Sequence, residues 1–474
     1  TTSPSSSTPH GTLPPPHLPQ RRNSLLYVLI VLAILFGGAI IAVTLYLNRE
    51  SHTTTSSTAS EVTTDNPTGE ESAEEGTEQH NSVAPVSYTL KGTCDGTPKK
   101  AMAGFSDPTI YIFFGGFALA TALHMQRLDR KIAVSLLRLS RGNMKVAVLM
   151  LFAVTAFLSM WISNTATAAM MLPLAMGMMS HLDQEKERKT YVFVLLGIAY
   201  CASIGGLGTV VGSPPNMIAA KALNLDFVGW MKLGLPMMLL ILPLMLFSMY
   251  VILKPNLNER VEVKAESIPW TLHRVIALLI FLAAAIAWVF SSKIKAAFGI
   301  SNPDTVIALI AAVAVVVFGV AQWKEVARNT DWGVLMLFGG GISLSALLQS
   351  SGASEALGQQ VASTFSHSPA LLVIFVVATF IIFLTEFTSN TASAALLVPI
   401  FASIAAQMGL PEQVLVFVIG VGASCAFMLP VATPPNAIVF GTGLIKQREM
   451  MNVGLLLNIL CVVLVALWAY VVLM

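Results

Sequence analysis

Charged side chains are scarce in this sequence. Asp, Glu, Lys and Arg make up 11% of its 474 residues, whereas hydrophobic residues make up 55% and the mean hydropathy is +0.73. A soluble domain carries about 25% charged residues, so this composition excludes an ordinary soluble domain and indicates a polytopic membrane protein. The formal net charge of +2 offers no surplus of either sign, so no nucleic-acid partner is predicted.

Cysteine is scarce as well. Of the 4 cysteines, Cys201, Cys425 and Cys461 lie in apolar stretches and Cys94 lies in a polar one, so no disulfide framework is predicted. No cluster of His, Cys or carboxylate side chains gathers at the helix interruptions described below, which argues against a membrane enzyme. We therefore predict no enzymatic activity and no organic cofactor.

Long apolar runs predict the membrane spans, because roughly 17 to 25 apolar residues cross the hydrocarbon core as a helix. Such runs lie at 25–47, 108–125, 236–253, 272–290, 304–320, 333–349 and 452–474. Two more helices are predicted at 191–232 and 412–443, and each is interrupted, by GGLGTVVGSPPN (205–216) and LPVATPPN (429–436). Glycine and paired proline remove helix propensity and backbone donors, so these two helices are predicted to be broken.

A Ser-Asn-Thr tripeptide occurs twice inside apolar runs, in SNTATAAMMLPLA (163–175) and SNTASAALLVPI (389–400). The apolar arms around it are about 15 to 17 residues long, or roughly 22 to 26 Å of helix, so re-entrant hairpins are predicted at 146–180 and 370–408. Basic residues flank the first hairpin at 127–145 and 186–189, whereas 350–369 and 408–413 contain no Lys or Arg. The positive-inside rule therefore places the ends of the two hairpins on opposite sides of the membrane.

Three landmarks recur in the same order at a nearly constant spacing. The spacing is 224 residues from Gly115 to Gly339, 226 from Asn164 to Asn390 and 220 from Asn216 to Asn436. With the flanking charges reversed, this duplication predicts an inverted-topology repeat, with repeat 1 at 108–253, a cytoplasmic connector at 254–271 and repeat 2 at 272–474. Such repeats place substrate and ion sites near the bilayer midplane.

The recurring motifs carry the chemistry of an ion and anion site. Each tripeptide offers two hydroxyls and an amide at the start of a helix, whose free N–H groups attract anions. The broken helices expose carbonyls that suit a hard cation such as sodium. Neither tips nor breaks contain Lys or Arg, so a bound anion would depend on helix ends and co-bound cations.

Glu386 lies three residues before the second tripeptide, inside an apolar segment. Carboxylates within a membrane are functional by default, but this one is equally suited to capping backbone amides near the tip. The sequence leaves both interpretations open.

The paired tripeptides, together with GSPPNMIAAKAL (212–223) and MLPVATPPNAIVFGTGL (428–444), resemble the motifs of the divalent anion:sodium symporter family. Residues 107–474 are similar to its bacterial INDY-type dicarboxylate transporters. The resemblance implies an all-α polytopic fold with elevator-type architecture, in which a transport domain moves against a scaffold. It also implies sodium-coupled symport of succinate, malate and fumarate by a homodimer that contacts lipid in the bacterial inner membrane.

The same resemblance implies which residues hold the ligands. The first sodium site would use Ser159, Ser163, Asn164 and the Gly212 carbonyl, and the second would use Thr385, Thr388, Asn390 and the Ala432 carbonyl. The dicarboxylate would contact Ser163, Asn164, Thr165, Ser213, Pro214, Ser389, Asn390, Thr391, Thr433 and Pro434.

The first quarter of the chain departs from this pattern. Subtracting 224 from the apolar runs of repeat 2 predicts counterparts at 48–66 and 80–96, which are polar. We expect a disordered tail at 1–24, a single anchor helix at 25–47 and an extracytoplasmic Ser/Thr/Glu-rich segment at 48–107. Two other functions stay open: a proton-coupled or exchange carrier of another divalent oxyanion on the same fold, and a non-transporting membrane receptor.

Overall fold

The computed structural model describes residues 102–138, 140–259, 268–365 and 368–474, all within one structural unit. The expectations for the tail 1–24, the anchor 25–47 and nearly all of the polar segment 48–107 lie outside the described residues. In the described ranges, the regular secondary structure is helical, so the predicted all-α fold class is confirmed.

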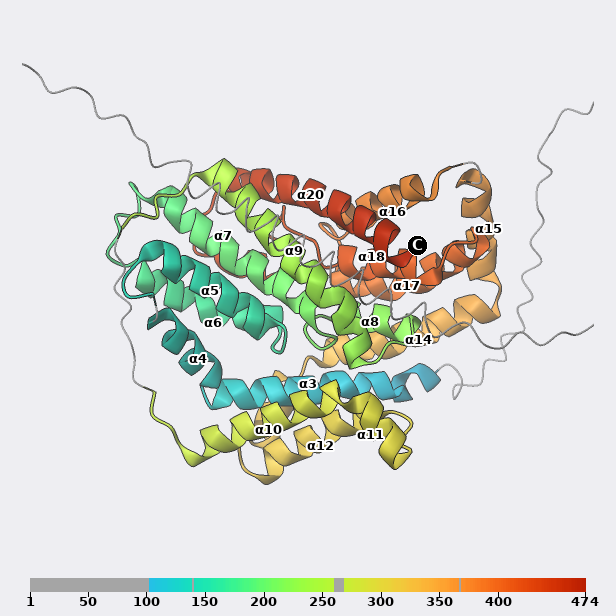
Figure 1. Ribbon diagram of the computed structural model, residues 1–474, viewed down its shortest axis with the longest axis horizontal. Helices are drawn as coiled ribbons and strands as arrows, with labels where there is room; N and C mark the ends of the chain where they lie inside the picture. The colour runs from blue at the N-terminus through green and yellow to red at the C-terminus, as the bar shows by residue number, and fades with distance from the viewer. Residues whose placement is uncertain (1–101, 139, 260–267, 366–367) are drawn as a thin grey trace, which may run out of the picture. The chain divides into compact units, whose positions relative to one another are not determined.

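The helices follow the order of the two repeats (Figure 1). A short 3-10 helix, η1 (Ala103–Ser106), precedes the first repeat. The first repeat contains α3 (Pro108–Met125), α4 (Leu128–Arg138), α5 (Met144–Ser159), α6 (Asn164–Met178), α7 (Arg188–Gly205), η2 (Gly206–Gly208), α8 (Pro214–Ala222) and α9 (Phe227–Leu253). The second contains α10 (Leu272–Val289), α11 (Ser291–Phe298), α12 (Pro303–Val317), α13 (Trp323–Asn329), α14 (Trp332–Ser350), α15 (Ala353–Phe365), α16 (Ala370–Leu384), α17 (Asn390–Gln407), α18 (Glu412–Gly422), α19 (Pro434–Phe440) and α20 (Gln447–Leu473).

The two repeats resemble each other in helix packing as well as in helix order. The second arm of each hairpin packs against the second half of the other repeat's broken helix, α6 against α19 and α17 against α8. The final helices α9 and α20 also pack together. A Cβ atom added to Gly234 of α9 would lie 2.3 Å from the Leu207 carbonyl oxygen, and one added to Gly454 of α20 would lie 2.2 Å from that of Phe427. Equivalent glycines therefore let each final helix approach the break of its own repeat.

The structure differs from the predicted broken helix at 191–232. Helix α8 already ends at Ala222, and α9 begins at Phe227, before the apolar run predicted at 236–253. Asp226 caps α9 by accepting a hydrogen bond from the Gly229 N–H at 2.7 Å, and Asn224 has a left-handed φ of 53°. Two polar residues in a mostly apolar stretch thus make the turn, as Asn and Asp commonly do.

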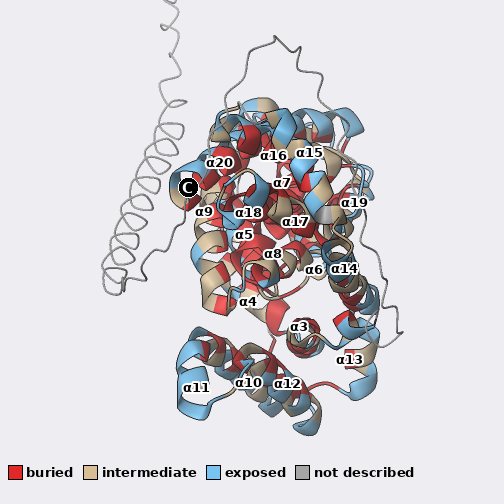
Figure 2. Cartoon of the chain, turned by 90° about the vertical axis from the view of Figure 1, so that its right-hand side faces the viewer, coloured by how far each residue is buried: buried red, intermediate tan, exposed pale blue. Residues whose placement is uncertain are grey.

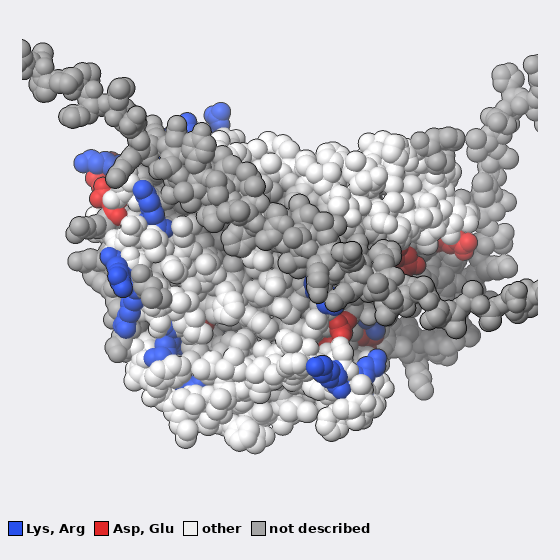
Figure 3. All heavy atoms as spheres, viewed as in Figure 1, with Lys and Arg blue, Asp and Glu red and all other residues white. Residues whose placement is uncertain are grey.

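Helix length and surface charge both fit a multi-pass membrane protein. In the described ranges, seven helices are long and apolar enough to cross a membrane, or eight if the bent pair α11 and α12 is one span. Helix α17 is among them, so length alone does not distinguish a hairpin arm from a span. In the view of Figure 3, Lys and Arg gather along one edge, over the ends of α4, α5 and α7, and in a second group near α11. The described surface that is visible between the two groups in this view is largely uncharged.

The core lies around the first halves of the two broken helices. The apolar window of α7 is buried along its whole length, and α18 is buried from Val414 to Gly422. By contrast, only 17% of the α10 window is buried, and Figure 2 shows pale exposed surface on α10, α11 and α12. Apolar side chains such as Leu279 and Ile310 are on this exposed surface, which suits contact with lipid.

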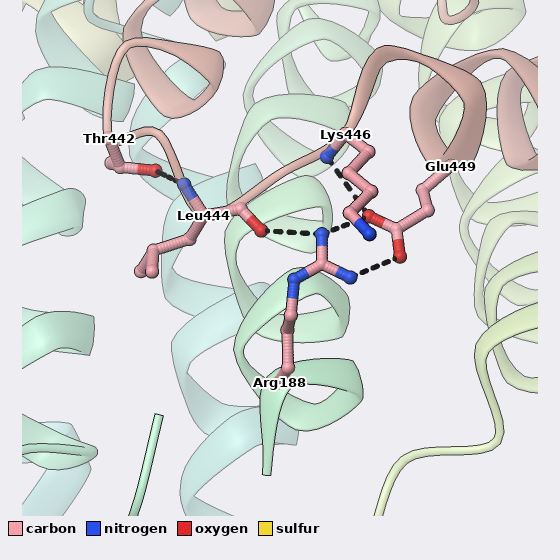
Figure 4. A network of polar contacts seen from close by, with 5 residues as sticks. All are labelled: Arg188, Thr442, Leu444, Lys446 and Glu449. Carbon is pink, nitrogen blue, oxygen red and sulfur yellow. Dashed lines mark hydrogen bonds and ion pairs between the residues drawn. The ribbon is translucent and has the colours of Figure 1, made fainter. Parts of the chain in front are cut away.

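An ion pair joins the start of α7 to the start of α20 (Figure 4). Arg188 donates from both terminal nitrogens to the Glu449 carboxylate at 2.7 Å, and it also donates to the Leu444 carbonyl at 3.1 Å. Bidentate pairing fixes orientation as well as distance. The link places the segment before α20 on the same side as the start of α7, as the inverted topology requires.

This topology predicts which side of the membrane single cysteines face. In a variant without native cysteines, Lys186→Cys, in the basic flank of the first hairpin, should react with a membrane-impermeant thiol reagent only from the cytoplasmic side. Gln360→Cys, on α15, should react only from the opposite side. Both positions are exposed. Reaction of both cysteines from one side would contradict the inverted arrangement.

Candidate functional site

The structure brings both tripeptides and both helix breaks together around one cavity of about 540 Å³, called here the central cavity. Every residue predicted to contact the dicarboxylate lines it: Ser163, Asn164, Thr165, Ser213, Pro214, Ser389, Asn390, Thr391, Thr433 and Pro434. Phe113 and Phe117 of α3 close another part of the wall. Among the described residues, no Lys, Arg or His lines this cavity, and Asp331 is its only carboxylate.

Each tripeptide starts a helix at the cavity wall. Ser163 caps α6 by accepting a hydrogen bond from the Ala166 N–H at 3.3 Å, and Ser389 caps α17 by accepting one from the Ala392 N–H at 3.4 Å. The asparagine of each tripeptide is the first residue of its helix. Two helix N-termini, each with a partial positive charge, therefore meet at one cavity.

Behind each tip, a hydroxyl joins the hairpin to the end of the neighbouring broken helix. Ser159 Oγ donates to the Ala202 carbonyl at 2.6 Å, and Thr385 Oγ1 donates to the Ala423 carbonyl at 2.9 Å. Ser159 and Thr385 are fully buried, and each hydroxyl lies 2.7 Å from the side-chain amide of the tripeptide asparagine. The two repeats thus build the same contact.

The Asn164 amide lies among oxygen atoms. With its nitrogen turned toward them, it donates to Ser159 Oγ at 2.7 Å, to the Ala202 carbonyl at 3.0 Å and to the Gly212 carbonyl at 3.3 Å. A Cβ atom added to Gly206 would lie 2.6 Å from the nearer end of the Asn164 amide group. The first tip and the first break are therefore closely packed, with no room for a side chain at Gly206.

The second predicted sodium set is only partly assembled. Thr385 and Asn390 are in contact, but the Thr388 hydroxyl donates to the Leu384 carbonyl at 3.0 Å and lies 2.7 Å from Ser393 Oγ. That hydroxyl is thus hydrogen-bonded within its own hairpin. Ala432 lines the central cavity.

The asparagine of each Pro-Pro-Asn sequence spans its own helix break, a role that was not predicted from the sequence. Asn216 Nδ2 donates to the Gly206 and Thr209 carbonyls, each at 2.7 Å. In the other repeat, Asn436 Nδ2 donates to the Ala426 and Leu429 carbonyls at 3.2 and 3.0 Å. Both asparagines are fully buried. The sequence held one signal for this role: each repeat has an asparagine at the same place, at the end of its helix break.

Glu386 caps the second break. Its carboxylate accepts hydrogen bonds from the backbone N–H groups of Phe427 at 2.7 Å, Met428 at 2.8 Å and Leu429 at 3.0 Å. The Asn458 amide of α20 donates a further bond at 2.7 Å. Glu386 is 1% exposed and does not line the central cavity. Of the two interpretations left open by the sequence, the structure supports the cap.

The two tips are covered differently. Trp161 in the first tip packs with its ring centroid 5.2 Å from that of Phe281 on α10 and 6.0 Å from that of Phe227 on α9. The equivalent residue of the second tip, Phe387, is 77% exposed. The first hairpin tip is therefore in aromatic contact with α10, whereas the second presents an open apolar side chain.

Known proteins are similar in sequence to this chain over most of its length. A family model described as the sodium:sulfate symporter transmembrane region matches residues 81–474. An uncharacterised transporter of Haemophilus influenzae is 57% identical over 78% of this chain and 82% of its own length. The sodium-dependent dicarboxylate transporter SdcS of Staphylococcus saprophyticus is 31% identical over 82% of this chain and 80% of its own length.

A solved structure shares the fold. The crystal structure of the Alcanivorax borkumensis YdaH transporter, described as having an unusual topology, matches with a TM-score of 0.54. The match covers 78% of this chain and 86% of the YdaH chain at 16% identity. At this low identity, the match supports a shared fold only.

The contacts of Glu386 predict a loss of stability on substitution. In Glu386→Gln, at least one buried backbone N–H of the second break loses a charged acceptor, which costs about 1–3 kcal/mol. Thermal unfolding of the purified protein in detergent should therefore occur at a lower temperature than for the wild type. Glu412→Gln, at an exposed position at the start of α18, is the control and should unfold as the wild type does. Equal stability of the two variants would rule out the capping role.

Proposed function

Because the chain belongs to the divalent anion:sodium symporters, the family of the sodium:sulfate symporter model, we propose that it is a sodium-coupled symporter of C4-dicarboxylates such as succinate, malate and fumarate. As a member of this family, it is an integral, multi-pass transport protein and not an enzyme, and its bacterial relatives indicate the inner membrane. The observation that carries the proposal is the convergence of both helix N-termini and both breaks on the central cavity. The SdcS relatives, which are named as sodium-dependent dicarboxylate transporters, support the choice of substrate.

The first sodium site is proposed at the oxygens that surround the Asn164 amide. Ser159 Oγ and the carbonyls of Ala202 and Gly212 all accept from one amide nitrogen, so they create the negative potential that a cation also requires. A half-turn of the amide would direct the Asn164 oxygen to the same point. The second site would use the equivalent group in repeat 2, Thr385 and Asn390, with carbonyls of the second break.

The dicarboxylate is proposed to bind in the central cavity, where Ser163 to Thr165 and Ser389 to Thr391 face it. Its two carboxylates would be stabilised by the N-termini of α6 and α17, each end contributing about 0.3–1 kcal/mol, and up to ~2 kcal/mol in a partly buried site. Because Asn164 and Asn390 would serve both ligands, ordering a tip around sodium prepares the same amide for the anion. Such coupling is reciprocal.

Proton coupling through Glu386 has little support in this geometry. Its carboxylate is hydrogen-bonded to three backbone amides and to Asn458, and Glu386 is not among the residues that line the cavity. Loss of the negative charge would weaken all of these bonds. The carboxylate is thus suited to holding the break and not to cycling between protonation states.

A homodimer with elevator motion forms part of the same proposal. Helices α3, α10 and α12 pack on one another and lie side by side at the lower edge of Figure 1, apart from the buried core around α7. They would form part of the scaffold against which the two hairpins and broken helices move. Lipid would cover the exposed apolar faces of α10 and α12.

Reconstitution tests the function directly. Proteoliposomes with an inward sodium gradient should accumulate labelled succinate, and unlabelled malate and fumarate should compete with it. Uptake driven equally well by a pH gradient without sodium would favour a proton-coupled carrier, and competition by sulfate alone would favour an inorganic oxyanion. Absence of accumulation under all these conditions would favour a receptor.

The close fit of Gly206 against Asn164 predicts a variant with weakened sodium dependence. In Gly206→Ala, the new methyl group would displace the Asn164 amide, because 2.6 Å is shorter than any ordinary contact of a Cβ atom. The sodium concentration for half-maximal uptake should rise by ~10-fold or more, as for a loss of about 1.4 kcal/mol. Gly177→Ala on α6, where an added Cβ meets nothing within 4 Å, is the control. An unchanged sodium dependence of Gly206→Ala would exclude this site.

A further inference from the structure

Among the described residues that line the central cavity, Asp331 is the only one with a charged side chain. Asp331 is exposed, and none of the ion pairs found among the described residues involves it. A cavity proposed to bind a dianion thus carries a negative charge in its wall. None of the contacts proposed above for sodium or the dicarboxylate uses this charge.

Asp331 lies in the short corner between α13 and α14, which is held against α3. The Trp332 indole Nε1 donates to the Ala327 carbonyl at 2.8 Å. The ring centroids of Trp323 and Trp332 lie 6.1 and 6.2 Å from that of Phe114 on α3, and Figure 2 shows α13 beside α3. The backbone that carries Asp331 therefore has a fixed place in the cavity wall.

The corner lies on the cytoplasmic side. Asn329, two residues before Asp331, lines a second cavity together with His124 and Met125 at the end of α3. The basic flank at 127–145 places this end of α3 on the cytoplasmic side. The second cavity and the central cavity share part of their lining, namely Phe117, Ala120 and Ser163. Asp331 therefore belongs to the cytoplasmic part of the central cavity wall.

The Asp331 side chain has one local task in the structure. It caps α14 by accepting a hydrogen bond from the Val334 N–H at 3.1 Å. Asparagine and serine cap helices about as well as aspartate does, so the cap alone does not require a charged side chain. The charge therefore needs a second explanation, and the cavity supplies one.

A negative charge in the cavity wall acts in opposite directions on the two proposed ligands. It attracts sodium and repels a dicarboxylate, and a charge beside a low-dielectric cavity acts more strongly than one on an open surface. The charges of two sodium ions and one dicarboxylate sum to zero, so attraction and repulsion largely cancel when all three are bound. The charge of Asp331 thus changes the affinity for each ligand alone more than the affinity for the complete set.

We propose that Asp331 is a specificity-determining residue of the central cavity, whose negative charge favours sodium and disfavours the dicarboxylate until sodium is bound. The inference rests on the proposed function. Because Asp331 lies on the cytoplasmic side, its charge acts on the cavity while ligands exchange with the cytoplasm. Movement of the anion without sodium is thereby limited.

The test removes the charge and keeps the cap. In Asp331→Asn, the affinity for labelled succinate in sodium-free detergent solution should rise by roughly threefold to tenfold at low ionic strength, and the affinity for sodium without succinate should fall by a similar factor. Equilibrium dialysis measures succinate binding, and the sodium-dependent rise of the unfolding temperature measures sodium binding. Succinate binding at saturating sodium should change less than about twofold. Both differences from the wild type should shrink as choline chloride is added, because salt screens exposed charges.

Two further variants separate the charge from the cap. Asp331→Ser also keeps a capping side chain and should bind both ligands as Asp331→Asn does. Asp331→Ala removes the cap as well, so it should lower the unfolding temperature and shift the two affinities by the same factors as Asp331→Asn. A change of affinity confined to Asp331→Ala would assign the residue to the cap alone and overturn the inference.

Asp183→Asn is the matched control. Asp183 is an exposed aspartate in the loop after the first hairpin, accepts a hydrogen bond from the Glu185 N–H at 3.0 Å and does not line the central cavity. This control should keep the wild-type affinity for both ligands. Equal shifts in the control, or shifts of both affinities in the same direction in Asp331→Asn, would contradict the inference.

The sodium measurement needs no anion, so it distinguishes failure of this inference from failure of the proposed function. If the wild type took up no succinate while Asp331→Asn bound sodium more weakly than the wild type, the proposed function would be wrong and the charge role of Asp331 would stand. If the wild type took up succinate with sodium while Asp331→Asn bound sodium as tightly as the wild type, the inference would be wrong and the proposed function would stand.

Discussion

The structure depends on one constraint: backbone polar groups freed by a helix break in an apolar core must find partners inside the protein. Both broken helices face this requirement, since α7 and α18 are buried where they end. Asn216 and Asn436 meet part of it by bonding to two carbonyls each across their own breaks. Ser159 and Thr385 bond to one more carbonyl at the end of each helix. The hairpin tips are thereby attached to the breaks, and the central cavity results from that attachment.

The two repeats meet the same requirement with different residues. In the first break, η2 continues the chain in helical form over Gly206–Gly208, and the Thr209 hydroxyl donates to the Met160 carbonyl. The second break has no helical segment between α18 and α19, so its N–H groups are left to the Glu386 carboxylate. One repeat therefore needs a buried carboxylate and the other does not. This explains why a single acidic residue lies deep in an apolar segment without lining the cavity.

The sequence predicted those parts of the fold and site that depend on local pattern. The second hairpin was expected at 370–408, and its helices occupy Ala370–Leu384 and Asn390–Gln407, because apolar runs and a recurring tripeptide mark both arms. The partners of Glu386 could not be predicted, since they lie 41 to 43 residues away in the break and 72 residues away on α20. The orientation of the Thr388 hydroxyl toward Ser393 depends likewise on a side-chain rotamer that no motif specifies. The turn at Asn224–Asp226 could not be predicted from hydropathy, because leucine and phenylalanine surround its two short polar residues.

The charge of the central cavity wall bears on how binding of an anion and of a cation could be coupled. On the proposed function, a fixed guanidinium in the central cavity would attract each carboxylate with about 4 kcal/mol at 4 Å and an effective dielectric constant near 20. A helix N-terminus contributes about 0.3–1 kcal/mol, and up to ~2 kcal/mol when partly buried. The stronger attraction of a guanidinium would hold the dicarboxylate whether or not sodium was bound, and the anion could then cross without the cation. With partial charges alone, tight binding would require the sodium ions. A cavity whose described lining contains no Lys or Arg would therefore couple transport of the anion to the sodium gradient.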